Sequence, residues 1–200
     1  GGSKSILPGI ADHATILSNH SYANLSDSHC GIGILEGNPS REEMDRMARL
    51  LEPNFIINVI LNNKDQVVKA VAGDIISAHR KGVQLYKEIS VVNFETSRDL
   101  VIACCPYPTD SNLYQALYGA AVTVKVPTPV VKKGGVIILM AHCSEGIGDE
   151  SFTKLIMRYK QPENLLKSLS KNDSTEHGQW AGQLWADLLS HANLIVVSKG

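Results

Sequence analysis

The sequence has no excess of charge of either sign, and this absence argues against several kinds of partner. Its 200 residues include 19 Lys and Arg against 20 Asp and Glu, which gives a formal net charge of -1. Proteins that bind nucleic acid or anionic membranes usually present a basic face to them. We therefore expect neither nucleic acid nor a membrane among the partners of this chain.

Long hydrophobic runs are also missing from the sequence. No stretch approaches the roughly 18 consecutive apolar residues typical of a membrane-spanning helix. The first residues lack the charged and apolar halves of a signal peptide. Because 44% of the residues are hydrophobic, the chain can still bury a sizeable core. These features predict a globular, cytoplasmic protein.

Cysteine is scarce, and its spacing does not favour a disulfide framework. No pair has the Cys-x-x-Cys spacing, and two of the cysteines are adjacent within an apolar run. Such cysteines are usually reduced core residues. We expect this for all four, which are Cys30, Cys104, Cys105 and Cys143.

The first predicted helix carries two histidines. Residues 11–23 have apolar side chains at helical spacing. On one continuous helix, His13 and His20 lie seven positions apart and project from the same stripe. We therefore expect this stripe to face something specific.

The remaining sequence of the first half of the chain predicts a β-hairpin with a helix on either side of it. A Ser-x-x-Glu capping box at residues 40–43 opens a helix that ends at Pro53. Two β-branched runs, residues 54–61 and 66–72, are separated by a short polar segment and predict a β-hairpin. A further helix is expected over residues 75–89.

From Asp99 onward the pattern becomes strand, loop and helix. Apolar strands that alternate with helices are typical of a mostly parallel sheet covered on both faces. Ligands of such sheets bind beyond the carboxyl ends of the strands, here at residues 106–115 and 142–149. The expected strands are residues 100–105, 136–141 and 193–197, and the expected helices are residues 110–122, 152–159 and 180–189.

These patterns together predict the fold class. We expect an α/β protein with two domains, mostly parallel sheets with flanking helices, and a Rossmann-like second domain. The apolar pattern is broken between residues 93 and 98, so the boundary is placed there. The predicted domains are residues 1–93 and 94–200.

Two residues stand out as candidates for chemistry. Lys4 follows two glycines and precedes a Pro-Gly turn, so the backbone can approach a ligand while the amine reaches it. By spacing alone, a lysine after glycines is more often an exposed loop residue, and Gly-Gly-Ser also fits a cloning linker. His20 alone is more often a structural histidine, although nickel does accept an imidazole nitrogen.

The combination of motifs is more specific. The first ten residues read GGSKSILPGI and are followed by Asn19-His20. This arrangement resembles the signature of the nickel-dependent lactate racemase family. The resemblance continues at residues 74–83, 106–115, 134–138 and 143–146.

The resemblance implies a cofactor and a mechanism. In that family the residue matching Lys4 is covalently attached to a nickel pincer nucleotide, a pyridinium bis-thiocarboxylate mononucleotide, and the residue matching His20 binds the nickel. A histidine base takes the substrate hydroxyl proton while the Cα hydride moves to the pyridinium ring. The implied partners are cofactor-synthesis proteins and a small 2-hydroxy acid.

The resemblance also gives the two domains their roles. Residues 1–93 would be the C-terminal part of the cofactor-bearing domain, and residues 94–200 would close over the active site. The family's two base histidines and a substrate-binding arginine precede the Gly-Gly-x-Lys motif. We therefore expect an N-terminally truncated fragment that lacks these catalytic histidines, and we expect neither His79 nor His142 to replace them.

The expected substrate contacts leave alternatives open. Gln115 matches a family glutamine near the substrate, but Tyr118 occupies the place of a family lysine. The resemblance implies a lactate-like racemase or epimerase, which is an isomerase, and Tyr118 favours a different 2-hydroxy acid or a sugar acid. Alternatively, Tyr118 only packs against its domain, or the protein is a binding protein that kept the fold without the chemistry.

Overall fold

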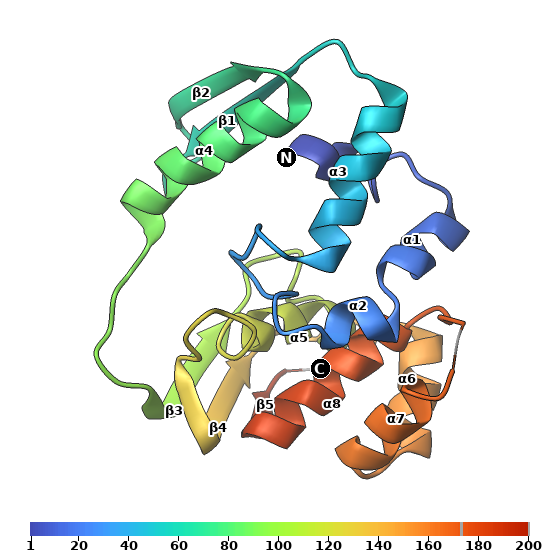
Figure 1. The fold of residues 1–200 in the computed structure, drawn as a ribbon. Coiled ribbons are helices and arrows are strands. Elements are labelled where there is room, and N and C mark those ends of the chain that lie inside the picture. The colour runs from blue at the N-terminus through green and yellow to red at the C-terminus, as the bar shows by residue number, and fades with distance from the viewer. Residues whose placement is uncertain (173, 200) are drawn as a thin grey trace. The chain divides into compact units, whose positions relative to one another are not determined.

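The computed structural model describes residues 1–172 and 174–199 (Figure 1). Contacts within the chain divide it into two units. Unit 1 comprises residues 1–19 and 39–94, and unit 2 comprises residues 20–38 together with the residues from Glu95 onward. The boundary at residue 94 lies next to the expected one, but residues 20–38 were expected in the first domain.

The contacts of residues 20–38 explain their place in unit 2. The Gln183 side-chain amide donates a hydrogen bond to Ser26 Oγ at 2.9 Å. The backbone N–H of Ile32 donates to the Lys125 carbonyl at 2.6 Å. Both partners come from the second half of the chain, more than 90 residues away. Local sequence patterns do not contain this information.

Unit 1 is built around the predicted hairpin. Strands β1 and β2 pair antiparallel, and α4 packs against them where Gly82 leaves room for Val71. The hairpin and the helices on either side of it confirm the prediction. The elements of unit 1 are η1 (Gly2–Ser5), α1 (His13–Asn19), α3 (Pro39–Leu51), β1 (Ile56–Leu61), β2 (Val67–Gly73) and α4 (Ile75–Ser90).

The expected single helix over residues 11–23 is wrong. Helix α1 ends at Asn19, and a separate helix α2 (Tyr22–Ser26) follows. Ser21 adopts extended backbone and caps α2 by accepting a hydrogen bond from the Asn24 N–H at 3.3 Å. His20 therefore lies between two helices and does not share a helical stripe with His13.

The capping box at residues 40–43 also has a different role. Helix α3 begins at Pro39, so Ser40 is already inside it. The Ser40 hydroxyl donates to the Asn19 carbonyl at 3.1 Å, and the Asn19 amide donates to Glu43 Oε2 at 2.7 Å. The Ser-x-x-Glu pair therefore fixes the end of α1. The predicted helix is confirmed, but its predicted cap is not.

Unit 2 contains the predicted parallel sheet. Its strands have the order β3-β4-β5 and are all parallel. This confirms an α/β fold with a parallel sheet and flanking helices. The elements of unit 2 besides α2 are β3 (Arg98–Cys104), α5 (Leu113–Ala121), β4 (Val131–Met140), α6 (Glu150–Arg158), α7 (Pro162–Leu169), α8 (Gln179–His191) and β5 (Asn193–Val197).

One face of the parallel sheet carries the core of unit 2. Ile137 and Leu139 of β4 are fully buried against α5 and α8, together with Leu117 and Leu188. Connections that advance in one direction across a parallel sheet place their helices on the same face. The steps from β3 to β4 and from β4 to β5 both advance in this way.

The opposite face of this sheet is open within the described residues, although we expected both faces to be covered. Leu100 and Ile102 are 51% and 62% exposed, and Ile195, in register with Ile102 through β4, is 50% exposed. The expected cover is missing because both crossovers leave their helices on the other face.

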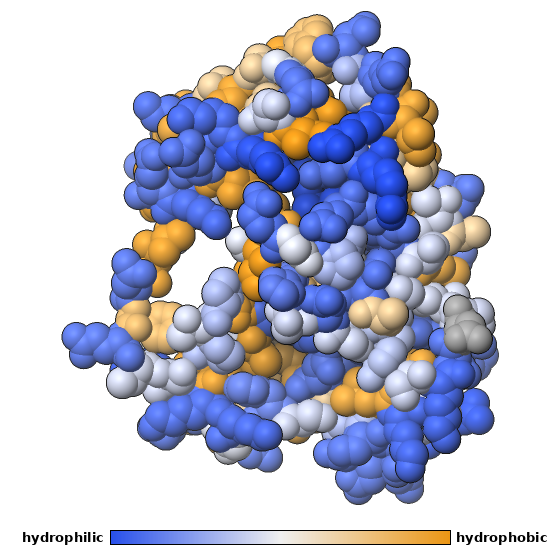
Figure 2. All heavy atoms as spheres, viewed as in Figure 1, coloured by the Kyte–Doolittle hydropathy of each residue, from blue (hydrophilic) through white to orange (hydrophobic). Residues whose placement is uncertain are grey.

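Apolar side chains also remain on the outer face of the hairpin in unit 1. Ile57, Val59 and Leu61 alternate along β1 and are exposed, whereas Ile60 between them is buried. Figure 2 shows orange, apolar surface in the region that Figure 1 labels β1 and β2.

Among the described residues, no helix is long and apolar enough to cross a membrane.

Candidate functional site

Lys4 lies on a short 3-10 turn between two buried residues, Ser3 and Leu7. Ser3 is fully buried, and its hydroxyl donates a hydrogen bond to Asp45 Oδ1 at 2.6 Å. Leu7 is also fully buried, and its backbone N–H donates to the Ser3 carbonyl at 3.1 Å. The Lys4 side chain itself is exposed. The turn is therefore anchored on both sides while the amine faces outward.

A polar network extends from Asp45 beneath this turn. Asp45 Oδ1 also accepts from Arg41 Nη2 at 3.2 Å, and both side chains are largely buried. Arg41 Nη2 lies 3.0 Å from His79 Nδ1, where neutral His79 accepts a hydrogen bond. Burial and then the positive charge of Arg41 lower the pKa of His79 to about 4. His79 is thus a neutral structural acceptor at pH 7.

Gly2 allows the turn to approach His79 closely. Its φ is +62°, a region that favours glycine. A Cβ at this position would lie about 2.5 Å from the His79 ring. Both the backbone conformation and the close approach of His79 therefore favour glycine at position 2. The sequence analysis identified the glycines but missed Arg41 and Asp45, which lie 39 and 43 residues after Gly2 in the chain.

His20 lies beside a row of aromatic side chains in unit 2. Its ring packs edge-to-face against Trp180, with centroids 6.5 Å apart and an interplanar angle of 64°. Trp180 in turn packs edge-to-face on Tyr114 at 5.2 Å, and Tyr114 packs on Phe152 at 5.7 Å. His20 is half-buried, whereas Phe152 is fully buried in the core. This row of aromatic rings therefore connects His20, the candidate metal ligand, to the core of unit 2.

The two predicted substrate residues lie on the exposed side of α5. Gln115 and Tyr118 are one helical turn apart, and Ala116 and Leu117 between them are fully buried. Tyr118 is 53% exposed, so most of its ring does not pack within its unit. Asn112 caps the start of this helix, and its side chain accepts from the Gln115 N–H at 3.0 Å. The predicted cap, Asp110, was therefore two residues early.

The loops after β3 and β4 lie side by side, as expected for strand ends of a parallel sheet. The Cys143 N–H donates to the Asp110 carbonyl at 2.8 Å, and the Glu145 N–H donates to the Ser111 carbonyl at 2.9 Å. The Asn112 amide also donates to Glu145 Oε2 at 2.9 Å. Glu145 thus has a structural role in holding the start of α5.

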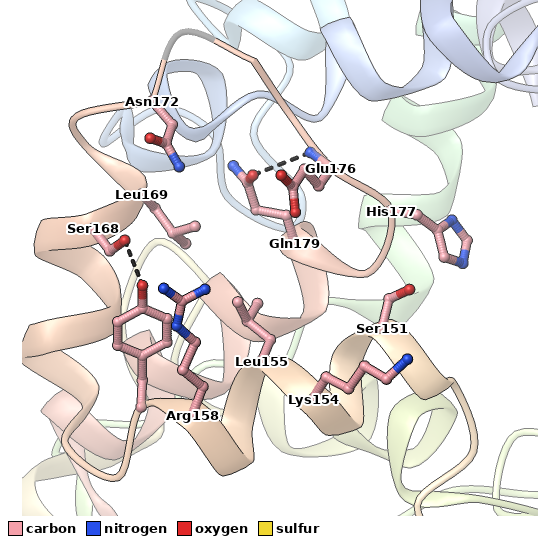
Figure 3. Close-up of a pocket in the computed structure, with 11 residues that line it drawn as sticks. Ser151, Lys154, Leu155, Arg158, Ser168, Leu169, Asn172, Glu176, His177 and Gln179 are labelled. Carbon is pink, nitrogen blue, oxygen red and sulfur yellow. Dashed lines mark hydrogen bonds between the residues drawn. The ribbon is translucent and has the colours of Figure 1, made fainter.

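A separate cavity of about 590 Å³ lies in unit 2 (Figure 3). Leu155, Arg158 and Ser168 are among the residues that line it, and Tyr159 and Ser168 share a hydrogen bond of 2.7 Å at its wall. None of the four predicted site residues lines this cavity. The cavity therefore does not identify the predicted site.

The side chains that could bind a metal in the described residues fit a metal ion that receives most of its ligands from a cofactor. No group of three or more His, Cys, Asp or Glu in residues 1–172 and 174–199 could hold a metal ion. One imidazole from His20 is compatible with nickel if an organic group supplies further donors. The exposed Lys4 amine is compatible with a bulky attached group. Lys4 belongs to unit 1, and His20, Gln115 and Tyr118 belong to unit 2.

The fold of unit 2 defines a class of protein. Its parallel strands alternate with helices, and the predicted substrate residues lie on the helix that follows the first strand-end loop. This is the arrangement of α/β proteins that bind small ligands at the carboxyl ends of their strands.

The chain belongs to the lactate racemase family, as the resemblance predicted. Residues 92–200 match the family described as "Lactate racemase C-terminal domain", and this match covers more than half of the chain. The lactate racemase of Thermoanaerobacterium thermosaccharolyticum is 35% identical over 200 residues, and that of Lactiplantibacillus plantarum is 34% identical over 200 residues. Each alignment covers 99% of this chain and 46% of the relative.

A solved structure gives the same result for the fold. The lactate racemase apoprotein from Thermoanaerobacterium thermosaccharolyticum matches with a TM-score of 0.89 and 34% sequence identity. The match covers 99% of this chain and 47% of that chain. The chain therefore spans about half the length of the relatives it matches.

Proposed function

We propose that this chain is part of a racemase or epimerase that acts on a lactate-like 2-hydroxy acid. In this proposal Lys4 carries a nickel pincer nucleotide through its side-chain amine, and His20 binds the nickel. The observation that supports it most directly is the Lys4 turn, which is held by buried Ser3 and Leu7 and leaves the Lys4 side chain exposed, in a chain 35% identical to a lactate racemase.

The protein's own residues have distinct tasks in this proposal. When bound, the cofactor supplies a hydride acceptor. Lys4 holds it through a covalent bond, and the anchored turn limits how far that bond can move. Gln115 and Tyr118 offer an amide and a phenol to the carboxylate or hydroxyl of the substrate. Each task requires a side chain that is accessible on its own unit, and all three are exposed.

Proton transfer is not assigned to a residue of this chain. His79 accepts a hydrogen bond from Arg41, and its pKa is lowered to about 4, so it is poorly matched to a base that works near neutral pH. Glu145 is occupied by Asn112. We propose that the bases lie in the part of the relatives' length that this chain does not span, and that cofactor-synthesis proteins are required as partners.

Tyr118 supports a second candidate substrate. A neutral phenol forms a hydrogen bond but lacks the charge that the family's lysine brings to this position. Because Tyr118 is exposed on α5, the exchange changes an accessible group and leaves the core intact. A different 2-hydroxy acid or a sugar acid is therefore the alternative to lactate.

The central experiment is intact-protein mass spectrometry combined with metal analysis. The full-length protein would be produced together with the cofactor-synthesis proteins, as wild type, Lys4→Ala and His20→Ala. We expect wild type to carry both an added mass and nickel. Lys4→Ala should lose the added mass, because no other amine replaces it on the turn. His20→Ala should keep the added mass but retain nickel less well.

Matched controls separate these effects from general damage. Lys69→Ala changes an exposed lysine of the hairpin, and His13→Ala changes an exposed histidine of α1. Both should behave like wild type in mass and in metal content. A wild-type protein with no added mass and no nickel would contradict the proposal and would favour a binding protein that kept the fold.

The substrate is tested by a racemisation screen over several 2-hydroxy acids and sugar acids. We expect Tyr118→Lys to raise kcat/KM for lactate relative to bulkier acids, because it restores a positive charge on α5. Equal activity profiles of wild type and Tyr118→Lys would show that residue 118 does not select the substrate.

A further inference from the structure

We propose that Trp180 is a positioning residue that fixes the orientation of the His20 ring for metal binding. This inference rests on the proposed function, because it assigns Trp180 a role only if His20 is a ligand. Trp180 lies 160 residues beyond His20 in the sequence, at the start of α8. Its role therefore follows from the fold of unit 2 and from no local motif.

The contact geometry is suited to orienting a ring. The edge-to-face arrangement of His20 and Trp180 restrains the plane of the imidazole through packing with the indole. A ligand that is held in one rotamer loses less conformational entropy when a metal binds it. Neighbours that orient a ligand histidine, most often through a hydrogen bond to its second ring nitrogen, affect metal affinity, and we assign a comparable orienting effect to the Trp180 ring.

Trp180 is itself held firmly at the start of α8. Gly178 has a φ of +77°, and a Cβ there would lie about 2.8 Å from the Phe152 backbone nitrogen, so the chain passes close to α6. The preceding His177 pairs through Nε2 with Asp149 Oδ2 at 2.8 Å. Asp149 Oδ1 accepts from the Phe152 N–H at 2.7 Å and caps α6. Two adjacent contacts therefore fix the helix start that carries Trp180.

The charge on Asp149 supports this arrangement. Burial opposes ionisation, but hydrogen bonds from the Phe152 N–H and from His177 outweigh it and lower the pKa of Asp149. The carboxylate therefore stays ionised and keeps its bond to His177 at neutral pH. Trp180 is oriented by a polar anchor on one side and by aromatic packing on the other.

The same row of rings leads to the substrate residues. Tyr114 packs on Trp180 and directly precedes Gln115. Burial raises the pKa of Tyr114, and a hydrogen bond with the Trp180 side chain partly opposes this increase. The Tyr114 N–H is also bound to the Ile147 carbonyl at 2.9 Å. Trp180 thus contacts both the proposed metal ligand and the start of the helix that presents Gln115.

The experiment measures nickel loss and does not depend on activity. Full-length holoprotein would be exposed to excess chelator, and nickel release would be followed over time for wild type, Trp180→Leu and Trp180→Phe. We expect release from Trp180→Leu to be on the order of tenfold faster than from wild type. Trp180→Phe should recover most of the difference, because a phenyl ring can still pack edge-to-face on His20.

Trp185→Leu is the matched control. Trp185 lies on the same helix but packs against Leu165 and Ala186, whereas the ring that contacts His20 is that of Trp180. Its replacement should lower the unfolding temperature as much as Trp180→Leu, or more, and leave nickel release near the wild-type rate. If both tryptophan variants released nickel equally fast, the effect would reflect a general loss of stability, and the inference would be overturned.

Two further outcomes distinguish this inference from the proposed function. If wild type carries nickel and His20→Ala loses it, but Trp180→Leu releases it at the wild-type rate, the positioning role is wrong and the proposed function stands. If wild type carries no nickel, the proposed function fails. The contact between His20 and Trp180 is then tested on metal-free protein by NMR. The resonances of the His20 ring protons should differ between wild type and Trp180→Leu. Unchanged resonances would show that the two rings are not in contact.

Discussion

The two residues proposed to hold the cofactor are supported by different kinds of interaction. The Lys4 turn in unit 1 rests on a network of hydrogen bonds and charges that includes Asp45, Arg41 and His79. His20 in unit 2 is packed against an aromatic row that begins with Trp180. Polar networks respond to charge and pH, whereas aromatic packing responds to side-chain volume. The two regions should therefore fail under different perturbations.

The largest expected effect removes the end of the aromatic row. Phe152→Ala leaves a cavity at a fully buried position and should lower the free energy of unfolding of unit 2 by about 3–5 kcal/mol. Urea unfolding followed by tryptophan fluorescence measures this, since both tryptophans of the chain lie in unit 2. The control Met157→Ala changes an exposed side chain on the same helix, α6, and should shift the midpoint little. Similar shifts in the two variants would contradict this account of the core.

A smaller effect is expected from breaking the polar network. Asp45→Ala removes the partner of both Ser3 and Arg41 and leaves a largely buried guanidinium without its carboxylate. We expect a loss of about 3 kcal/mol in unit 1, measured by hydrogen exchange in α3 and α4. Lys81→Ala breaks an exposed hydrogen bond with Gln84 on α4, and should cause no measurable change. Unchanged exchange in Asp45→Ala would show that the network does not stabilise the turn.

The smallest effect is a pH dependence. The folded state keeps His79 neutral down to about pH 4, whereas an unfolded histidine takes up a proton near pH 6.5. Stability therefore decreases as the pH falls from about 6.5 to about 4, because the unfolded state binds the extra proton. In His79→Gln this part of the decrease should disappear, a difference on the order of 1 kcal/mol.

Thermal unfolding at several pH values provides the measurement for His79. The variant should have a shallower decrease of Tm with falling pH than wild type. His29→Gln, at an exposed position in unit 2, is the matched control and should follow wild type. A slope in His79→Gln equal to that of wild type would mean that His79 is not the group responsible.

Local patterns in the sequence were sufficient to predict most elements. The hairpin follows from two β-branched runs, and the last strand was expected at residues 193–197, where β5 lies. Helix α7 was missed, although Pro162 at its first position is a usual start signal. The helix break at His20 was also missed, since Ser21 is as compatible with a helix interior as with a cap until its backbone is seen.

Only those residues of the candidate site that belong to a sequence motif were predictable. Lys4 and His20 were named from a short signature, but their surroundings depend on residues distant in the chain. Asp45 lies 42 residues from Ser3, and Trp180 lies 160 residues from His20. Side-chain contacts across such separations are set by the packing of whole elements. The sequence pattern of a single segment cannot show them, and the roles of Lys4, His20, Gln115 and Tyr118 remain predictions for the experiments above.

The open face of the β3-β4-β5 sheet has a practical consequence for work with this chain. An array of exposed Leu and Ile side chains, such as Leu100, Ile102 and Ile195, favours association with any similar surface, including another molecule of the same chain. In the 200-residue chain, scattering and the binding of apolar dyes should therefore increase with protein concentration and decrease when Ile102 is replaced by a polar residue. Unfolding measurements on this chain are best made in a dilution series, so that loss of structure is separated from the dissociation of such aggregates.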